Sequence, residues 1–435
     1  MFSAFAPKVS AQQPTVDWSP MFHHDIAHTG YSSSTGPLTN ETLWSFPTDN
    51  SLEYLSPAVV NGVVYVGSDD DSVYALNATT GSKIWSYATG SAVESSPAVA
   101  NGMVYIGSDD NNVYALNAMT GAKIWNYTTG GEVYSSPSVV NGVVYVGSND
   151  FNVYALNAAT GSKIWSYSTG NYVYSSPAVV NGVVYIDSYV AVYALNAKAG
   201  SKIWSYATGG PMFSSPAFVN GLVYVDSNDT VYALNAKSGS KIWSYSTGGV
   251  VESSPAVANG MVYVGSDDNN IYALNATTGG KIWSYATGNV VDSSPFVANG
   301  VVYVGSEDAN VYALNATTGG KIWSFTTGSA VESSPVVVNG VVYVGSDDNN
   351  VYAFGSIVVP QPSTTLPSLS PSLSPSASSK PSTSTISSGS LLIIISSVII
   401  VVIIIGLVVG LSMKKSTSKT NNLTMSTALS SSNNL

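Results

Sequence analysis

Carboxylates are the side chains of this sequence that are best placed to do chemistry. They recur as pairs in short loops: Asp69 and Asp70, Asp109 and Asp110, Asp267 and Asp268, Asp347 and Asp348. The strand pattern predicts that every carboxylate from Glu53 to Asp348 lies in loops on one face of the molecule, or at their edges, with the repeat lysines on the other face. Such a face attracts cations or a basic partner. The alternative is that these loop tips only keep the protein soluble.

One variable position of the repeat is a candidate ligand site. It lies two residues before the serine of each Ser-Pro pair, where the innermost strand begins. Aromatic side chains occupy it in units three to five, and acids occupy it in units six to eight. A ligand with one apolar and one cationic side would suit this set, and neutral drift at a solvated position is the alternative. The candidate ligand-binding residues are Tyr54, Glu94, Tyr134, Tyr174, Phe213, Glu252, Asp292 and Glu332.

Other kinds of chemistry find little support. His24 and His28 could share a metal ion if their segment were helical, but Pro20 and Gly30 bracket it tightly and favour a capping segment. The chain has no cysteine and no arginine, and its net charge of -11 argues against a nucleic-acid partner. No Ser-His-Asp arrangement or phosphate loop is present. We therefore predict no catalytic residue, no metal and no cofactor.

A repeat of 39 to 41 residues positions these side chains. Its unit reads SSPAVVNGVVYVGSDDNNVYALNATTGSKIWSYATG. The Asn-Gly dipeptide closes a two-residue hairpin, and three further strands follow as VVYVGS, VYALNA and KIWSYAT. Four antiparallel strands in about 40 residues form one propeller blade. The Ser-Pro pairs and the repeat tryptophans both count eight. The sequence predicts an all-β fold, an eight-bladed β-propeller of four-stranded antiparallel blades.

The ends of the array predict a closed ring. The first tryptophan strand, Leu43–Phe46, precedes the first Ser-Pro pair and has no blade of its own. The last unit stops at Tyr352–Phe354 without a tryptophan strand. Since unpaired strands would leave exposed edges, we expect the N-terminal strand to complete the last blade.

The segment Ala75–Trp85 resembles the A-x-D-x-x-T-G-x-x-x-W repeat of PQQ-like, BamB-like propellers, with Asn77 in the aspartate position. The leader Trp18–Gly30 is similar to segments that precede the propeller in such proteins. The resemblance implies that the tryptophan of each outer strand docks between adjacent blades. These structural docking residues are Trp44, Trp85, Trp125, Trp165, Trp204, Trp243, Trp283 and Trp323.

Quinoprotein alcohol dehydrogenases share the fold that this resemblance implies. They hold a quinone over a tryptophan, often beneath a disulfide, with a calcium ion and an aspartate base. This sequence has no cysteine and lacks the long insertions that build such a pocket. We therefore expect the protein not to be an enzyme. BamB, a scaffold of the β-barrel assembly machinery, is the closer analogy.

The remaining sequence predicts a membrane anchor. Leu391–Leu411 is apolar and, at about 1.5 Å per residue, long enough to cross a bilayer, and Lys414, Lys415 and Lys419 follow on the cytoplasmic side by the positive-inside rule. The predicted division is a signal-peptide remnant (1–17), a leader packing on the ring (18–41), the propeller (42–355), a Pro/Ser/Thr-rich stalk (356–390), a transmembrane helix (391–411) and a cytoplasmic tail (412–435).

These features together predict a non-enzymatic scaffold at the cell membrane, with an extracellular propeller that offers its acidic face to a protein or a glycan. The alternative is a small-ligand or calcium site at the channel mouth, and a PQQ-dependent dehydrogenase is the least favoured possibility.

Overall fold

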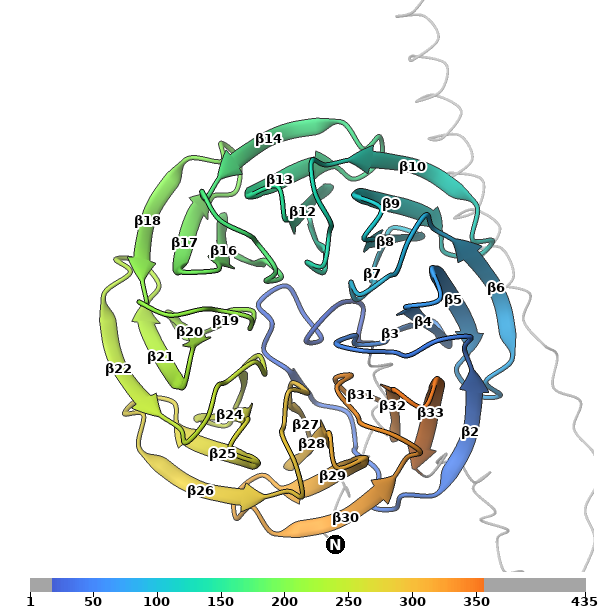
Figure 1. Ribbon diagram of the computed structural model, residues 1–435, viewed down its shortest axis with the longest axis vertical. Helices are drawn as coiled ribbons and strands as arrows, with labels where there is room; N and C mark the ends of the chain where they lie inside the picture. Colours follow the sequence, from blue (N-terminus) through green and yellow to red (C-terminus); the bar gives the residue numbers. More distant parts are fainter. Residues whose placement is uncertain (1–17, 356–435) are drawn as a thin grey trace, which may run out of the picture. The chain divides into compact units, whose positions relative to one another are not determined.

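The computed structural model describes residues 18–355 as a ring of eight four-stranded antiparallel sheets (Figure 1). Blades 1 to 7 each contain four consecutive strands. The innermost strands of blades 1 to 8 are β3 (Ala58–Val60), β7 (Ala98–Ala100), β11 (Ser138–Val140), β15 (Ala178–Val180), β19 (Ala217–Val219), β23 (Ala256–Ala258), β27 (Phe296–Ala298) and β31 (Val336–Val338). The second strands are β4 (Val63–Ser68), β8 (Met103–Gly107), β12 (Val143–Gly147), β16 (Val183–Ser188), β20 (Leu222–Ser227), β24 (Met261–Ser266), β28 (Val301–Ser306) and β32 (Val341–Ser346).

The two outer positions of each blade complete the sheets. The third strands are β5 (Ser72–Asn77), β9 (Asn112–Asn117), β13 (Asn152–Asn157), β17 (Ala191–Asn196), β21 (Thr230–Asn235), β25 (Asn270–Asn275), β29 (Asn310–Asn315) and β33 (Asn350–Gly355). The outermost strands are β6 (Lys83–Ala88), β10 (Lys123–Thr128), β14 (Lys163–Ser168), β18 (Lys202–Ala207), β22 (Lys241–Ser246), β26 (Lys281–Ala286), β30 (Lys321–Thr326) and, for blade 8, β2 (Thr42–Pro47).

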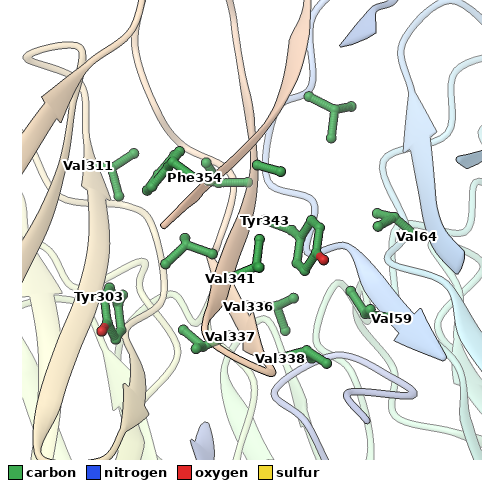
Figure 2. Packing of buried hydrophobic residues seen from close by; sticks show 14 of the residues in the cluster. Val59, Val64, Tyr303, Val311, Val336, Val337, Val338, Val341, Tyr343 and Phe354 are labelled. Atoms are coloured by element: carbon green, nitrogen blue, oxygen red, sulfur yellow. The ribbon is translucent and has the colours of Figure 1, made fainter. Parts of the chain in front are cut away.

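The ring closes as the sequence predicts. Strand β2 pairs with β33 in antiparallel register, with Trp44 opposite Ala353 and Ser45 opposite Tyr352. Blade 8 is thus built from both ends of the propeller. Figure 2 shows the buried side chains around this junction, where Tyr303 of blade 7, Tyr343 of blade 8 and Val59 of blade 1 belong to one hydrophobic cluster.

Each outer-strand tryptophan joins its blade to the next one. The Trp85 ring is 8% exposed, and its Nε1 donates a hydrogen bond of 3.0 Å to the Ala118 carbonyl of blade 2. The Tyr65 hydroxyl donates to the same carbonyl at 3.1 Å. In blade 7, Trp323 and Tyr303 donate instead to the carbonyl of Pro37, because blade 8 takes its outer strand from the N-terminal side. The same joint therefore recurs around the ring.

The joint also explains the glycine of the Thr-Gly turn. Gly81 has a φ of +69°, and a Cβ added there would lie 2.7 Å from the Trp44 ring. Gly62 has a similar φ of +75°, but a Cβ there would meet nothing within 4 Å. We expect Gly81→Ala to lower the free energy of unfolding by about 1–2 kcal/mol more than Gly62→Ala, because only the former forces a tryptophan out of place. Urea unfolding of both variants tests this, and equal losses would contradict it.

The leader (residues 18–41) crosses the centre of the ring, as the central trace in Figure 1 shows. Its hydrogen bonds and close polar contacts reach all eight blades. Ser19 exchanges two backbone hydrogen bonds with Val59, and the short strand β1 (Tyr31–Ser32) pairs in parallel with β27. Backbone amides of five other inner strands donate to it as well: Val99 to Pro20, Val179 to Ile26, Phe218 to Ala27, Val257 to Thr29 and Val297 to Gly30. In blade 8 the amide of Asn339, just after β31, donates to the Ser34 hydroxyl. In blade 3 the Ser138 hydroxyl lies 3.4 Å from His28 Nε2.

This path has a simple physical cause. The innermost strands are edge strands, whose backbone groups would otherwise face the channel unpaired. The leader pairs them, so it is a plug inside the ring rather than a segment that merely packs on it.

The predicted segments 1–17, 356–390, 391–411 and 412–435 lie outside the described residues. Within residues 18–355 no helix is long and apolar enough to cross a membrane.

Candidate functional site

A pocket of about 520 Å³ opens at the channel mouth on the acidic face. Its floor includes Phe22 of the leader, so the plug gives the channel a closed end. Side chains from six consecutive blades form the walls: Tyr54, Glu94, Glu132, Tyr134, Ser136, Asn149, Tyr172, Tyr174, Ser176, Phe213, Ser215 and Glu252. A volume of this size is typical of small-molecule and anchor-residue sites.

The structure brings together six of the eight side chains at the variable position. Tyr54, Glu94, Tyr134, Tyr174, Phe213 and Glu252 line the pocket. Asp292 and Glu332 do not line it, but both lie close enough to Tyr54 to influence its ionisation. Burial raises the pKa of the Tyr54 hydroxyl, and Glu332 and Asp292 raise it further. Phe22, Glu132 and Tyr172 also line the pocket. The sequence did not predict them as site residues, because they do not lie at the variable position two residues before the Ser-Pro serine.

A hydrogen-bonded ring of serines fixes the height of these side chains. The amide of each Ser-Pro serine donates to the hydroxyl of the same serine in the next blade, for example Ser96 to Ser136 at 2.9 Å. The series runs from Ser56 to Ser334, where the amide donates to the Leu55 carbonyl instead. Since each variable residue precedes its serine by two positions, the ring holds all eight near the same level of the mouth.

The acids of the channel mouth lie close enough together to raise one another's pKa values. Burial raises the pKa of Glu94 to about 8, and Asp109 and Asp69 add to the rise. Burial likewise raises the pKa of Asp292 to about 8, and the nearby Glu252 carboxylate is the second cause of that rise. Burial also raises the pKa of Asp347 to about 7. No lysine lines the pocket, and the repeat lysines begin the outermost strands at the opposite face. A cation at the mouth would remove this mutual repulsion.

The second aspartate of each loop pair has a structural role. Asp110 accepts hydrogen bonds from the Tyr114 hydroxyl at 2.5 Å and from the Gly90 amide of the preceding blade connection at 2.8 Å. Burial alone would raise the pKa of Asp110, but these hydrogen bonds and those from Asn112 outweigh it and lower the pKa. The same arrangement recurs at Asp70, Asp150, Asp268, Asp308 and Asp348. In each aspartate pair the second residue is therefore a structural staple, while the first, here called the free acid, keeps one buried oxygen without a hydrogen-bond partner.

This division predicts opposite effects for neighbouring residues. Asp110→Asn should lower the free energy of unfolding by about 1–2 kcal/mol, because an amide replaces a charged acceptor of several hydrogen bonds. Asp109→Asn should leave it unchanged or raise it, because Asp109 has a pKa raised to about 6 by burial and by Glu132 and Asp69. Urea unfolding measures both, and equal losses would contradict the division.

The raised pKa values also predict how stability changes with pH. Between the unfolded-state pKa near 4 and the folded values of about 7 to 8, the folded chain binds more protons, so its stability falls as the pH rises. His23 and His28 act oppositely: burial lowers their pKa values to about 4 and 3, so they reduce stability only below about pH 6.5. We expect the melting temperature to increase from pH 8.5 to pH 6.5 in a thermal scan. A decrease over that range would contradict this assignment.

Two carboxylates correct the prediction that all of them lie in or beside the loops of one face. Asp187 and Asp226 lie in β16 and β20, are 1% and 0% exposed, and occupy the place of a repeat glycine such as Gly107. No oxygen of either carboxyl has a hydrogen-bond partner. The nearby Ser214 hydroxyl lowers the pKa of Asp226, but burial outweighs it. Burial raises both pKa values well above the usual range, and Asp226 adds to the rise for Asp187. The sequence marks these two buried aspartates only by the replacement of the repeat glycine, which occurs in blades 4 and 5.

The histidines do not form a helical metal pair. His23, His24 and His28 all have positive φ angles, between 51° and 77°. His23 stacks on Phe22 with ring centroids 4.5 Å apart, and His28 meets the same ring edge-on at 5.3 Å. Within residues 18–355 no group of three histidine or acidic side chains converges in a way that could hold a metal ion.

The pocket also fits poorly to the quinone cofactor that related folds hold. Pyrroloquinoline quinone is a tricarboxylate, whereas Glu94, Glu132 and Glu252 line this pocket and no lysine does. The floor is the ring of Phe22, and the eight repeat tryptophans lie on outermost strands. When they are ionised, these carboxylates repel an anionic cofactor.

Fold and pocket define a closed eight-bladed propeller with an acidic, partly aromatic mouth. The family model described as outer membrane protein assembly factor BamB matches residues 33–189, 129–215, 149–249, 190–294 and 286–356. These matches span most of the chain, and the protein belongs to this family.

Solved structures share the fold at low identity. BamB from Moraxella catarrhalis is 20% identical, with a TM-score of 0.64, over 73% of this chain and all of that one. A europium-containing methanol dehydrogenase is 16% identical, with a TM-score of 0.66, over 78% of this chain and 98% of its own. The quinohemoprotein alcohol dehydrogenase from Comamonas testosteroni is 17% identical, with a TM-score of 0.68, over 78% and 80%. No curated protein matches the chain.

Proposed function

We propose that this protein is a non-enzymatic binding propeller at the cell surface, which presents its acidic loop face to a basic protein partner. The cell-surface position rests on the apolar segment 391–411 and the lysines that follow it. The observation that carries the proposal is the cluster of acids at the channel mouth, whose pKa values are raised by burial and mutual repulsion.

Membership of the BamB family supports a protein partner, since the family is described as an assembly factor. An enzymatic role receives less support from this chain's own residues. The dehydrogenases of similar fold carry out chemistry on a cofactor, and the acidic lining of this pocket opposes an anionic one. A neutral glycan is a less suitable partner, because it has no cationic group to pair with the carboxylates of the channel mouth.

The test is binding of octalysine to the full chain, measured by isothermal titration calorimetry at low and high salt and at pH 9, where Asp292, with a pKa of about 8, is ionised. We expect binding that weakens with salt and that falls about tenfold when Glu252, Asp292 and Glu332 are replaced by Gln, Asn and Gln, because three attractive charges are lost. Glu41→Gln is the matched control for Glu252→Gln alone, since each removes one charge and Glu41 is exposed just before β2, away from the mouth.

Two results would overturn the proposal. Octalysine that fails to bind shows that the acidic face does not recruit cations. Binding that falls as much in Glu41→Gln as in Glu252→Gln alone shows that only net charge matters, not the mouth.

A further inference from the structure

We propose that the channel-mouth pocket is an arginine-anchoring site, in which the partner inserts a guanidinium group against an aromatic wall between Glu94 and Glu252. This proposal rests on the proposed function above and names the chemical group that the pocket recognises. The argument uses the shape of the pocket, its rings and the position of its charges.

The shape is that of a socket with one opening. The leader closes the inner end of the channel, and Phe22, which is 7% exposed, lies at the floor. The pocket above Phe22 has a volume of about 520 Å³, which exceeds that of one side chain. The neighbours of an inserted residue therefore also fit. A protruding segment of a folded partner can therefore enter from the acidic face alone.

The aromatic wall consists of Tyr134, Tyr172, Tyr174 and Phe213, from blades 3, 4 and 5. The Tyr172 and Tyr174 rings stack with centroids 5.7 Å apart, and Tyr174 lies 5.8 Å from Tyr134 and 6.2 Å from Phe213. Tyr172 is 43% exposed and Phe213 is 39% exposed. Clustered exposed rings mark interaction sites on soluble proteins, and their faces attract cations.

The carboxylates flank this wall on both sides. Glu94 comes from blade 2 and Glu252 from blade 6, while Glu132 already accepts hydrogen bonds from Asn149 at 3.0 Å and from Tyr134 at 3.3 Å. Burial and neighbouring acids raise the pKa values of Glu94 and Glu252. A cation placed on the rings would lie between two acids that lack a countercharge.

A guanidinium fits this arrangement better than the other cationic side chain. It is planar and weakly hydrated, so it stacks on rings and pairs with a carboxylate through two parallel hydrogen bonds. An ammonium is a strongly hydrated point charge that gains less from the aromatic wall. The chain contains no arginine of its own that could occupy the site.

The test compares the tripeptides Gly-Arg-Gly, Gly-Lys-Gly and Gly-citrulline-Gly in calorimetric titrations of the full chain at pH 9, where Glu94, with a pKa of about 8, is ionised. We expect the arginine peptide to bind at least tenfold more tightly than the other two. Phe213→Ala and Glu252→Gln should each weaken it at least fivefold. Matched controls are Ile84→Ala, an apolar residue 48% exposed on an outer strand, and Glu41→Gln, and both should leave it unchanged.

Each contrary result has a separate meaning. Equal binding of the arginine and lysine peptides overturns the guanidinium assignment. Binding of octalysine without binding of the arginine peptide overturns this inference while the proposed function stands, and failure of both overturns both. Binding of neutral chitotriose that is lost in Phe213→Ala but kept in Glu252→Gln overturns it in favour of a glycan.

Discussion

Replacing Trp44 with alanine is expected to lower the free energy of unfolding by about 3–5 kcal/mol, the range for a buried large aromatic side chain. Trp44 lies on β2, the strand that closes the ring, and is 7% exposed. It packs on Tyr343 with ring centroids 5.9 Å apart, and its Nε1 donates to the Ala78 carbonyl of blade 1 at 3.0 Å. Its loss weakens the contacts of blade 8 with blade 1, where the strand that closes the ring meets the first blade.

Urea unfolding of the full chain measures this effect, with Trp18→Ala as the control. Trp18 is the one tryptophan of the chain outside the repeat, and it is 43% exposed, so its replacement should cost less than about 1 kcal/mol. If Trp44→Ala cost no more than the control, β2 would not hold the ring closed.

Replacing Phe22 with alanine is expected to cost a similar amount, about 3–5 kcal/mol, and also to loosen the plug. Phe22 is 7% exposed and holds the rings of His23 and His28 in place. The amides of Val99, Val179 and Phe218 donate to the leader on either side of it. Hydrogen exchange at these three amides should therefore become faster, because the carbonyls that protect them lose their support.

The control for this effect is Ile26→Ala in the same leader, where the side chain is 37% exposed. It should change stability by less than about 1 kcal/mol and leave exchange at Val99 unchanged. Unaltered exchange at all three amides in Phe22→Ala would contradict the role of the leader as a plug.

Much of the fold could be predicted from the sequence because the repeat states it eight times. The Asn-Gly hairpins, the alternation in the second strand and the positions of the eight tryptophans all agree with the four-stranded blade. The unpaired strands at Leu43–Phe46 and Tyr352–Phe354 predicted the closure seen between β2 and β33.

The path of the leader and the roles of individual aspartates could not be predicted, because they depend on contacts that the repeat pattern does not show. The leader occurs once, so no pattern shows that its carbonyls pair with the inner strands of several blades. Asp109 and Asp110 look alike in sequence, and only the Tyr114 hydroxyl and the Gly90 amide distinguish the staple from the free acid. Asp187 and Asp226 look like loop-edge acids until their burial is seen.

The central claim is that the acidic mouth receives a cationic partner and not a quinone. The most direct measurement is a thermal unfolding scan of the full chain with octalysine and, separately, with pyrroloquinoline quinone and calcium. Because a ligand of the folded state raises the melting temperature by mass action, octalysine should raise it, and quinone with calcium should leave it unchanged. An increase that needs both quinone and calcium, with none from octalysine, would contradict this account and favour a dehydrogenase.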